Sequence, residues 1–211
     1  MIFNKDEIRF DLSNLYIQKM IAESEVSLDV DEVLLALNKG SAKFVKDVYG
    51  KTITTEEQIN WSYIYDKYPR IVEFWSEWEK YSTIPMIQGA RKFVNDLKQI
   101  VGEKGVQIVT SSPESIIKNK TPWLQELFGI EKVFNVNSEI GPKSMYTKNT
   151  ILVDDGLHNI DDHVSTGSTG IIFNYNDSYG WNKEERNHPL IHRASNYDQV
   201  LKIVKSQVEN R

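Results

Sequence analysis

The chain has 211 residues, no cysteine and a formal net charge of −5 at neutral pH. This length suits a single domain, or one with a modest insertion, and it is enough to bury a large core without cross-links. The lack of cysteine excludes disulfides, thiolate metal sites and cysteine nucleophiles, and it is compatible with a reducing cytoplasm. The negative net charge gives no sign of a general nucleic-acid-binding protein.

The first 24 residues mix polar and apolar side chains. Four of the five residues 5–9 are charged, so we expect no signal-peptide core there. We expect a helical lead-in at Leu12–Ile21 rather than a separate domain. No stretch of the chain approaches the roughly 20 apolar residues that a membrane-spanning helix needs, so we expect no membrane partner.

The first predicted strand ends abruptly in carboxylates. Val26-Ser27-Leu28 is a short β-rich run, and Asp29-Val30-Asp31 follows it directly. This pattern predicts a buried strand with polar residues at its C-terminal end. Leucines at positions 34, 35 and 37 predict that the chain turns into a helix directly after the acidic pair.

Residues 40–84 are rich in aromatic side chains and have helical spacing on both sides of Pro69. Each side carries one apolar stripe with intervals of i, i+3, i+4 and i+7, which is typical of an amphipathic helix. We therefore predict two short helices that break at Pro69. The residues of the two stripes are Trp61, Ile64, Tyr65 and Tyr68, then Ile71, Phe74, Trp75 and Trp78.

Strands and helices alternate through the rest of the chain. We predict helices at 90–101, 114–128 and 197–208, and strands at 106–110, 133–136, 150–153 and 170–173, with no strand after the last of these. Such alternation predicts a mostly parallel sheet with helices on both faces, which is a three-layer α/β/α, Rossmann-like core. Ligands of such sheets bind at the carboxyl ends of the strands.

Polar residues converge on that edge of the predicted sheet. Asp29 and Asp31 follow the first strand, Thr110 ends the second, and Asp154-Asp155 follows the strand at 150–153. Two carboxylates at one strand end repel each other unless a cation or a proton separates them. Taken singly, each pair has a plain alternative, because aspartates also occur in solvated turns and at helix N-caps.

Hydroxyl groups and a lysine complete the candidate set. Thr110 and Ser111 precede a predicted helix, where hydroxyl and main-chain N–H groups can hold a phosphoryl oxygen. Lys143 lies in the turn Gly141-Pro142-Lys143 between two strands. The alternatives are ordinary helix capping for the hydroxyl groups and a solvated side chain for the lysine.

The set as a whole resembles the haloacid dehalogenase superfamily of phosphohydrolases. An Asp-x-Asp pair, a Thr/Ser, a Lys and an Asp-Asp pair follow one another in the order and placement of the four motifs of that superfamily, over about residues 25–175. A receiver domain of two-component signalling uses similar residues. In a receiver domain, however, the acidic pair comes first and the lysine last. The order of the residues in this chain therefore excludes a receiver domain.

The resemblance implies a role for each residue. Asp29 is the nucleophile and forms an aspartyl-phosphate, while Asp31 protonates the leaving alcohol and later deprotonates the attacking water. Thr110 and Ser111 bind phosphoryl oxygen, and Lys143 neutralises both that oxygen and Asp29.

The resemblance also implies a magnesium ion. Asp29, Asp154 and Asp155 hold it together with the main-chain carbonyl of Asp31, and which carboxylate of the Asp154-Asp155 pair is the direct ligand stays open. Oxygen ligands of this kind suit Mg²⁺. Dehalogenases of the superfamily lack the second aspartate of the first motif, so Asp31 argues against dehalogenation. Glu32 is a departure, because many members carry glycine there.

Shorter runs carry a finer resemblance. They are Ile84–Ala90, Ile108–Pro113, Leu152–Asp155 with Asn159, Phe173–Asn176 and Arg193–Val200. These runs are similar to the cytosolic and mitochondrial 5'(3')-deoxyribonucleotidase family. The resemblance implies a deoxynucleoside monophosphate as substrate and suggests a homodimer. We expect a cytoplasmic location.

The superfamily places a helical cap between its first two motifs. We therefore divide the chain into a lead-in (1–24), a core (25–38 and 85–211) and a cap (39–84). Aromatic side chains in the cap could stack on a base, although most are needed for the cap interior. Our candidates for contact with substrate are Trp61, Tyr65, Phe74 and Trp75.

Two other functions stay open. The same chemistry could act on the 3'-phosphate of a nucleic-acid end or on a phosphosugar, and the scaffold could serve an inactive binding protein. None of the four histidines is predicted to be catalytic. His158 and His163 are expected on a surface helix, and no acidic partner completes a zinc motif around His188 and His192.

Overall fold

The structure is a computed structural model that describes residues 24–54, 61–136 and 141–210. The helix predicted at 12–21 lies outside the described residues. Within the described ranges no helix combines the length and the apolar composition that crossing a membrane requires.

The core of the molecule is a six-stranded parallel sheet with strand order β3-β2-β1-β4-β5-β6. Strands β1, β2 and β4 lie at its centre and consist almost wholly of buried residues, as expected of a sheet covered on both faces. The strands are β1 (Val26–Leu28), β2 (Val106–Ser111), β3 (Val133–Val136), β4 (Ile151–Asp154), β5 (Gly170–Phe173) and β6 (Ile191–Ala194).

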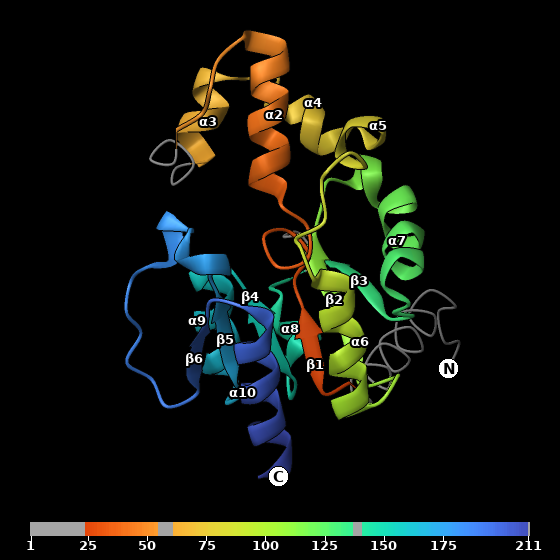
Figure 1. The fold of residues 1–211 in the computed structure, drawn as a ribbon, viewed down its shortest axis with the longest axis vertical. Coiled ribbons are helices and arrows are strands. Elements are labelled where there is room, and N and C mark those ends of the chain that lie inside the picture. Colours follow the sequence, from red (N-terminus) through yellow and green to blue (C-terminus); the bar gives the residue numbers. More distant parts are fainter. Residues whose placement is uncertain (1–23, 55–60, 137–140, 211) are drawn as a thin grey trace, which may run out of the picture.

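Helices cover both faces of the sheet, which confirms the predicted three-layer core. In Figure 1, α6 (Ala90–Val101) and α10 (Tyr197–Glu209) pack side by side on one face, while α8 (Ser144–Thr147) and α9 (Leu157–Ser165) lie on the other. The predicted apolar stripe of α6 is its buried face, at Ala90, Phe93, Val94 and Leu97. Helix α7 (Glu114–Phe128) packs beside β3.

A helical insertion follows β1 and stands above the carboxyl ends of the strands (Figure 1). Its helices are α2 (Leu37–Tyr49), α3 (Trp61–Lys67), α4 (Ile71–Ser76) and α5 (Trp78–Tyr81). The expected break at Pro69 is present. The second predicted helix is divided into α4 and α5, because the backbone of Glu77, which lies between them, is extended. The helix expected directly after the acidic pair begins only at Leu37, after a loop.

Polar side chains join the three central strands from within the sheet. The amide of Gln107 on β2 donates to the Ser27 hydroxyl on β1 at 2.7 Å, and that hydroxyl is 2.7 Å from the hydroxyl of Thr150, just before β4. Ser27 and Gln107 are also register partners. The three strands that carry the candidate site are therefore tied to one another by side chains as well as by the main chain.

Two expectations from the sequence are wrong. Strand β6 was not predicted, because it is a four-residue edge strand that contains His192 and Arg193 and follows a proline. His163 is not a surface residue, since its side chain is fully buried. Its Nδ1 lies 2.8 Å from the Thr147 hydroxyl and its Nε2 lies near the Thr169 carbonyl, so it joins α9 to neighbouring elements.

Gly40 allows the close packing of α2 and α4. A Cβ atom at this position would lie 2.7 Å from Cζ of Phe74 and 3.2 Å from Cγ1 of Ile84. We expect Gly40→Ala to lower the free energy of unfolding by about 1–3 kcal/mol, as overpacking of a core does. Urea denaturation measures this loss. Lys39→Ala, at an exposed position of the same helix, should change it by less than about 0.5 kcal/mol; equal effects of the two variants would contradict this account.

Candidate active site

The register of the central strands brings two aspartates together. Leu28 pairs with Val153, so Asp29 and Asp154 leave β1 and β4 at the same level, and the main-chain N–H of Asp29 donates to the Val153 carbonyl at 2.9 Å. Among the described residues, Asp29, Asp154 and Asp155 each offer a carboxylate oxygen within 4.8 Å of the others. We call these three residues the acidic cluster. Hard oxygen donors this close fit a divalent cation such as Mg²⁺.

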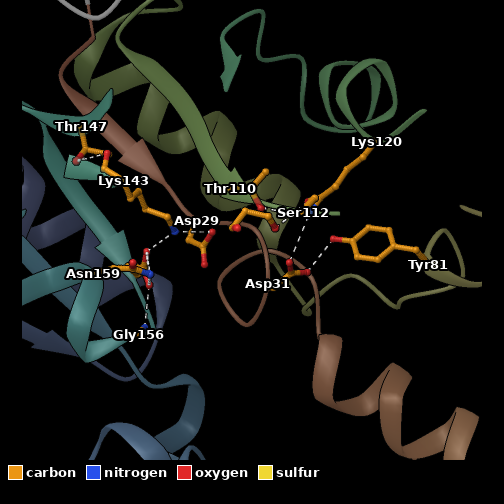
Figure 2. Close-up of polar contacts among 12 residues, drawn as sticks. Asp29, Asp31, Tyr81, Thr110, Ser112, Lys120, Lys143, Thr147, Gly156 and Asn159 are labelled. Carbon is orange, nitrogen blue, oxygen red and sulfur yellow. Dashed lines mark hydrogen bonds and ion pairs between the residues drawn. The ribbon is translucent and has the colours of Figure 1, made fainter. Parts of the chain in front are cut away.

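Lys143 lies at the start of α8 and reaches into the acidic cluster (Figure 2). Its Nζ is 2.9 Å from Oδ1 of Asp29 and 2.6 Å from Oδ2 of Asp154. Burial alone would lower the pKa of Lys143, but the carboxylates of Asp154 and Asp29 raise it above its usual value, so the ammonium group stays charged. One buried cation thus pairs with two buried carboxylates and offsets part of their charge.

Asp154 is held on every side, whereas Asp155 is not. The Asp154 carboxylate is fully buried and accepts from the main-chain N–H of Gly156 at 2.8 Å and from the Asn159 amide at 3.0 Å, in addition to Lys143. Asp155 accepts from the indole N–H of Trp181 at 2.8 Å. These contacts fix the orientation of Asp154 before any ligand binds, whereas Trp181 contacts one oxygen of Asp155.

Burial and mutual repulsion oppose the ionised state of the acidic cluster. Burial raises the pKa of Asp29 to about 7, and the neighbouring carboxylates of Asp154 and Asp31 add to the effect against the opposing charge of Lys143. Burial likewise raises the pKa of Asp155 well above its usual value, with Asp154 and Asp29 as further causes. A proton or a metal ion relieves the same repulsion.

Asp31 lies apart from the acidic cluster, and two residues that the sequence did not single out hold it. The Tyr81 hydroxyl of α5 donates to Oδ1 at 2.8 Å, and Nζ of Lys120 in α7 is 3.3 Å from Oδ2 (Figure 2). Lys120 also donates to the hydroxyl of Thr110 at 3.1 Å. No strand-end pattern marks Tyr81 or Lys120, because both come from helices.

Glu32 adopts a left-handed backbone with φ of 59°. This conformation costs residues other than glycine about 1–2 kcal/mol. The side chain is buried, and its Oε1 accepts from the main-chain N–H of Asn38 at 2.5 Å. Burial raises the pKa of Glu32 to about 7. Glu32 therefore caps the first turn of α2.

The remaining candidates lie at different depths. Ser111 is exposed, whereas Thr110 is buried beside Lys120. In the insertion, Phe74 is buried with its ring 5.5 Å from that of Phe44. The indole N–H of Trp75 donates to the Ser41 hydroxyl, Tyr65 is 46% exposed, and the side chain of Trp61 lies outside the described residues.

A family model described as "5' nucleotidase, deoxy (Pyrimidine), cytosolic type C protein" matches residues 23–207. This span covers both the sheet with its acidic cluster and the helical insertion. The chain belongs to this family. The match confirms the family predicted from the sequence and makes the protein a hydrolase of the haloacid dehalogenase superfamily, of nucleotidase type. No curated protein matches the sequence.

Solved structures share the fold at low sequence identity. A haloacid dehalogenase hydrolase from Entamoeba histolytica superposes with a TM-score of 0.59 at 16% identity, over 89% of this chain and all of that chain. A superfamily hydrolase from Geobacter sulfurreducens gives 0.53 at 13% identity, over 86% and 96% of the two chains. One from Xanthomonas campestris gives 0.52 at 13% identity, over 89% and 94%. These likenesses confirm the predicted fold.

Magnesium should stabilise the protein more at about pH 8 than at about pH 6, because the ion must displace the proton that Asp29 holds below a pKa of about 7. Without metal, the change of stability with pH has the opposite sign. The folded-state pKa of Asp29 exceeds the ordinary value of 3.8, so the contribution of Asp29 to stability falls as pH rises from about 4 to about 7. Thermal unfolding with and without Mg²⁺ measures both trends. Asp29→Asn should lose most of the metal-induced shift; a shift that does not change with pH would contradict this assignment.

Glu32→Gln should stabilise the protein above about pH 7 and have little effect near about pH 4.5. The folded-state pKa of Glu32 is raised to about 7 from 4.5, so ionisation of the buried carboxyl costs stability as pH rises through that window. A glutamine keeps an oxygen for the Asn38 N–H without the charge, and the expected gain is on the order of 2 kcal/mol. Denaturant unfolding at the two pH values tests this. Glu131→Gln, at an exposed position, serves as the control, and a loss of stability in Glu32→Gln above about pH 7 would refute the prediction.

Proposed function

We propose that the protein is a magnesium-dependent phosphomonoester hydrolase that acts through an aspartyl-phosphate on deoxynucleoside or nucleoside monophosphates. The observation that carries this proposal is the setting of Asp29. Its carboxylate contacts Lys143, and it has an oxygen within 4.8 Å of carboxylate oxygens of Asp154 and Asp155. A nucleophile for a phosphate dianion needs a positively charged setting, and Lys143 supplies part of it.

In the first step, a carboxylate oxygen of Asp29 attacks phosphorus, an O–P bond forms, and the bond from phosphorus to the ester oxygen breaks. Asp31 gives its proton to the departing oxygen. In the second step, Asp31 takes a proton from water as that water attacks phosphorus, and phosphate leaves Asp29. Thr110 and Ser111 bind the phosphoryl oxygens, and Lys143 neutralises their charge.

Magnesium would be held by the carboxylates of Asp29, Asp154 and Asp155 and by the main-chain carbonyl of Asp31. Asp155 is the better direct ligand of its pair, because the oxygens of Asp154 already accept from Lys143, Gly156 and Asn159. When bound, the ion supplies Lewis-acid polarisation of the phosphoryl group and a template for its orientation.

The family supports a nucleotide as substrate. We keep the division into a core (25–38 and 85–211) and a cap (39–84). A base would enter between the edge of the sheet in the core and the helices of the cap. Tyr65 and Trp75 are the stronger candidates for contact with a base, because Phe74 is enclosed in the cap interior. A cytoplasmic location and a homodimer remain expectations from the family.

The first test is phosphate release from a panel of 5'- and 3'-(deoxy)nucleoside monophosphates and phosphosugars, with magnesium or with EDTA. We expect deoxynucleotides to turn over only with magnesium. Asp29→Asn should abolish turnover, a loss of at least about 10³-fold, since no other group replaces the nucleophile. The matched control is Asp47→Asn, which changes an exposed carboxylate on α2 that pairs with Lys43.

The outcomes separate the alternatives. Preferred turnover of phosphosugars, or of nucleic acid with a 3'-phosphate end, would keep the chemistry and reject the nucleotide as substrate. Full activity of Asp29→Asn would reject the aspartyl-phosphate. Failure to release phosphate from any compound, in a folded protein that still binds nucleotide, would favour the binding protein.

A further inference from the structure

The carboxylate of Asp31 is held at both oxygens, and the two donors come from different parts of the molecule. Tyr81 belongs to α5 of the helical insertion and donates to Oδ1 at 2.8 Å. Lys120 belongs to α7 of the core and lies 3.3 Å from Oδ2. Figure 2 shows the two side chains approaching Asp31 beside Thr110.

Lys120 is an unusual lysine because only 2% of its surface is exposed. Besides Asp31, its Nζ contacts the hydroxyls of Ser112 at 2.7 Å and Thr110 at 3.1 Å, and it lies 4.6 Å from the centre of the Tyr81 ring. A buried ammonium group is costly unless such partners surround it. These contacts give Nζ a fixed place from which it orients Asp31.

Tyr81 is equally fixed. The side chain is 3% exposed, and its ring lies 6.5 Å from that of Trp78 in a stacked arrangement and 6.4 Å from that of Trp123 edge-on. Trp78 also meets Trp123 edge-on at 5.4 Å. Because Trp123 belongs to α7, this aromatic group joins the insertion to the core at the point where the Tyr81 hydroxyl reaches Asp31.

We propose that Tyr81 and Lys120 are positioning residues that hold the carboxyl group of Asp31 in line with the leaving oxygen of the substrate. The inference rests on the proposed function, in which the proton of Asp31 moves to the ester oxygen as the phosphorus–oxygen bond breaks. Such a transfer needs the acid within hydrogen-bond reach of that oxygen. Since Tyr81 comes from the insertion, the acid is aligned only when the insertion is seated on α7.

Leaving-group dependence separates positioning from general damage to the site. An alkyl leaving group, such as the 5'-oxygen of a nucleoside, needs a proton as it departs, whereas nitrophenolate does not. We therefore compare a deoxynucleoside 5'-monophosphate with p-nitrophenyl phosphate in Tyr81→Phe and Lys120→Met. The measurements are kcat, KM and the single-turnover rate of leaving-group release. Asp31→Asn, which removes the general acid itself, gives the largest effect to be expected.

We expect each variant to slow release of the nucleoside by about 10-fold or more, within the 10²–10⁴-fold that general acid catalysis supplies. Release of nitrophenolate should change less than about twofold, and the loss on the nucleotide should appear in kcat rather than in KM. Tyr49→Phe and Lys98→Met are matched controls away from Asp31. The first removes a hydroxyl that accepts from the main-chain N–H of Arg70, and the second removes a buried ammonium group that donates to the Gly129 carbonyl. These controls should leave both rates unchanged.

Three results would overturn the proposal. One is an equal loss on both substrates in variants whose far-UV and near-UV circular dichroism match the wild type. Another is an unchanged rate on the nucleotide in Tyr81→Phe and in Lys120→Met. The third is an Asp31→Asn variant that shows no leaving-group dependence, which would remove the role of Asp31 while leaving the hydrolase intact. A wild-type protein that releases phosphate from neither substrate would instead reject the proposed function itself, and the positioning role with it.

Discussion

The contact of Lys143 with Asp29 and Asp154 is the interaction on which the site depends. Parallel strands bring three carboxylates to within 4.8 Å, in a place where solvent cannot screen them well. Removing either partner of a buried ion pair leaves an uncompensated charge, which is strongly destabilising. Lys143 stabilises this arrangement, although burial, with Asp154 and Asp31 as further causes, still holds the pKa of Asp29 above its ordinary value. The remaining negative charge is what a cation or a phosphate-bound metal would meet.

Much of this arrangement could be predicted from the sequence because it follows from topology. In a parallel α/β sheet, residues that end neighbouring strands must meet at one edge, so Asp29, Thr110 and Asp154 could be placed together from their strand patterns alone. The order of the motif residues along the chain also pointed to the superfamily. Strand β6 could not be predicted, because its polar edge position removes the apolar run that marks a buried strand.

The surroundings of Asp31 could not be predicted for a different reason. Tyr81 and Lys120 are separated from it by 50 and 89 residues and come from helices, where aromatic and lysine side chains are common on any face. Their significance arises only when α5 and α7 pack together. The left-handed backbone of Glu32 is likewise a property of the three-dimensional loop.

The hydrogen bonds among Ser27, Gln107 and Thr150 help to set the register in which the central strands pair. Three adjacent apolar strands could pair in more than one alignment with similar burial, and a slip of one residue would shift Asp29 by about 3.3 Å relative to Asp154 and turn its side chain to the opposite face. A slipped pairing would also leave these buried polar groups without partners, at about 1–3 kcal/mol each. The chain therefore discriminates against misaligned sheets with residues that never meet substrate.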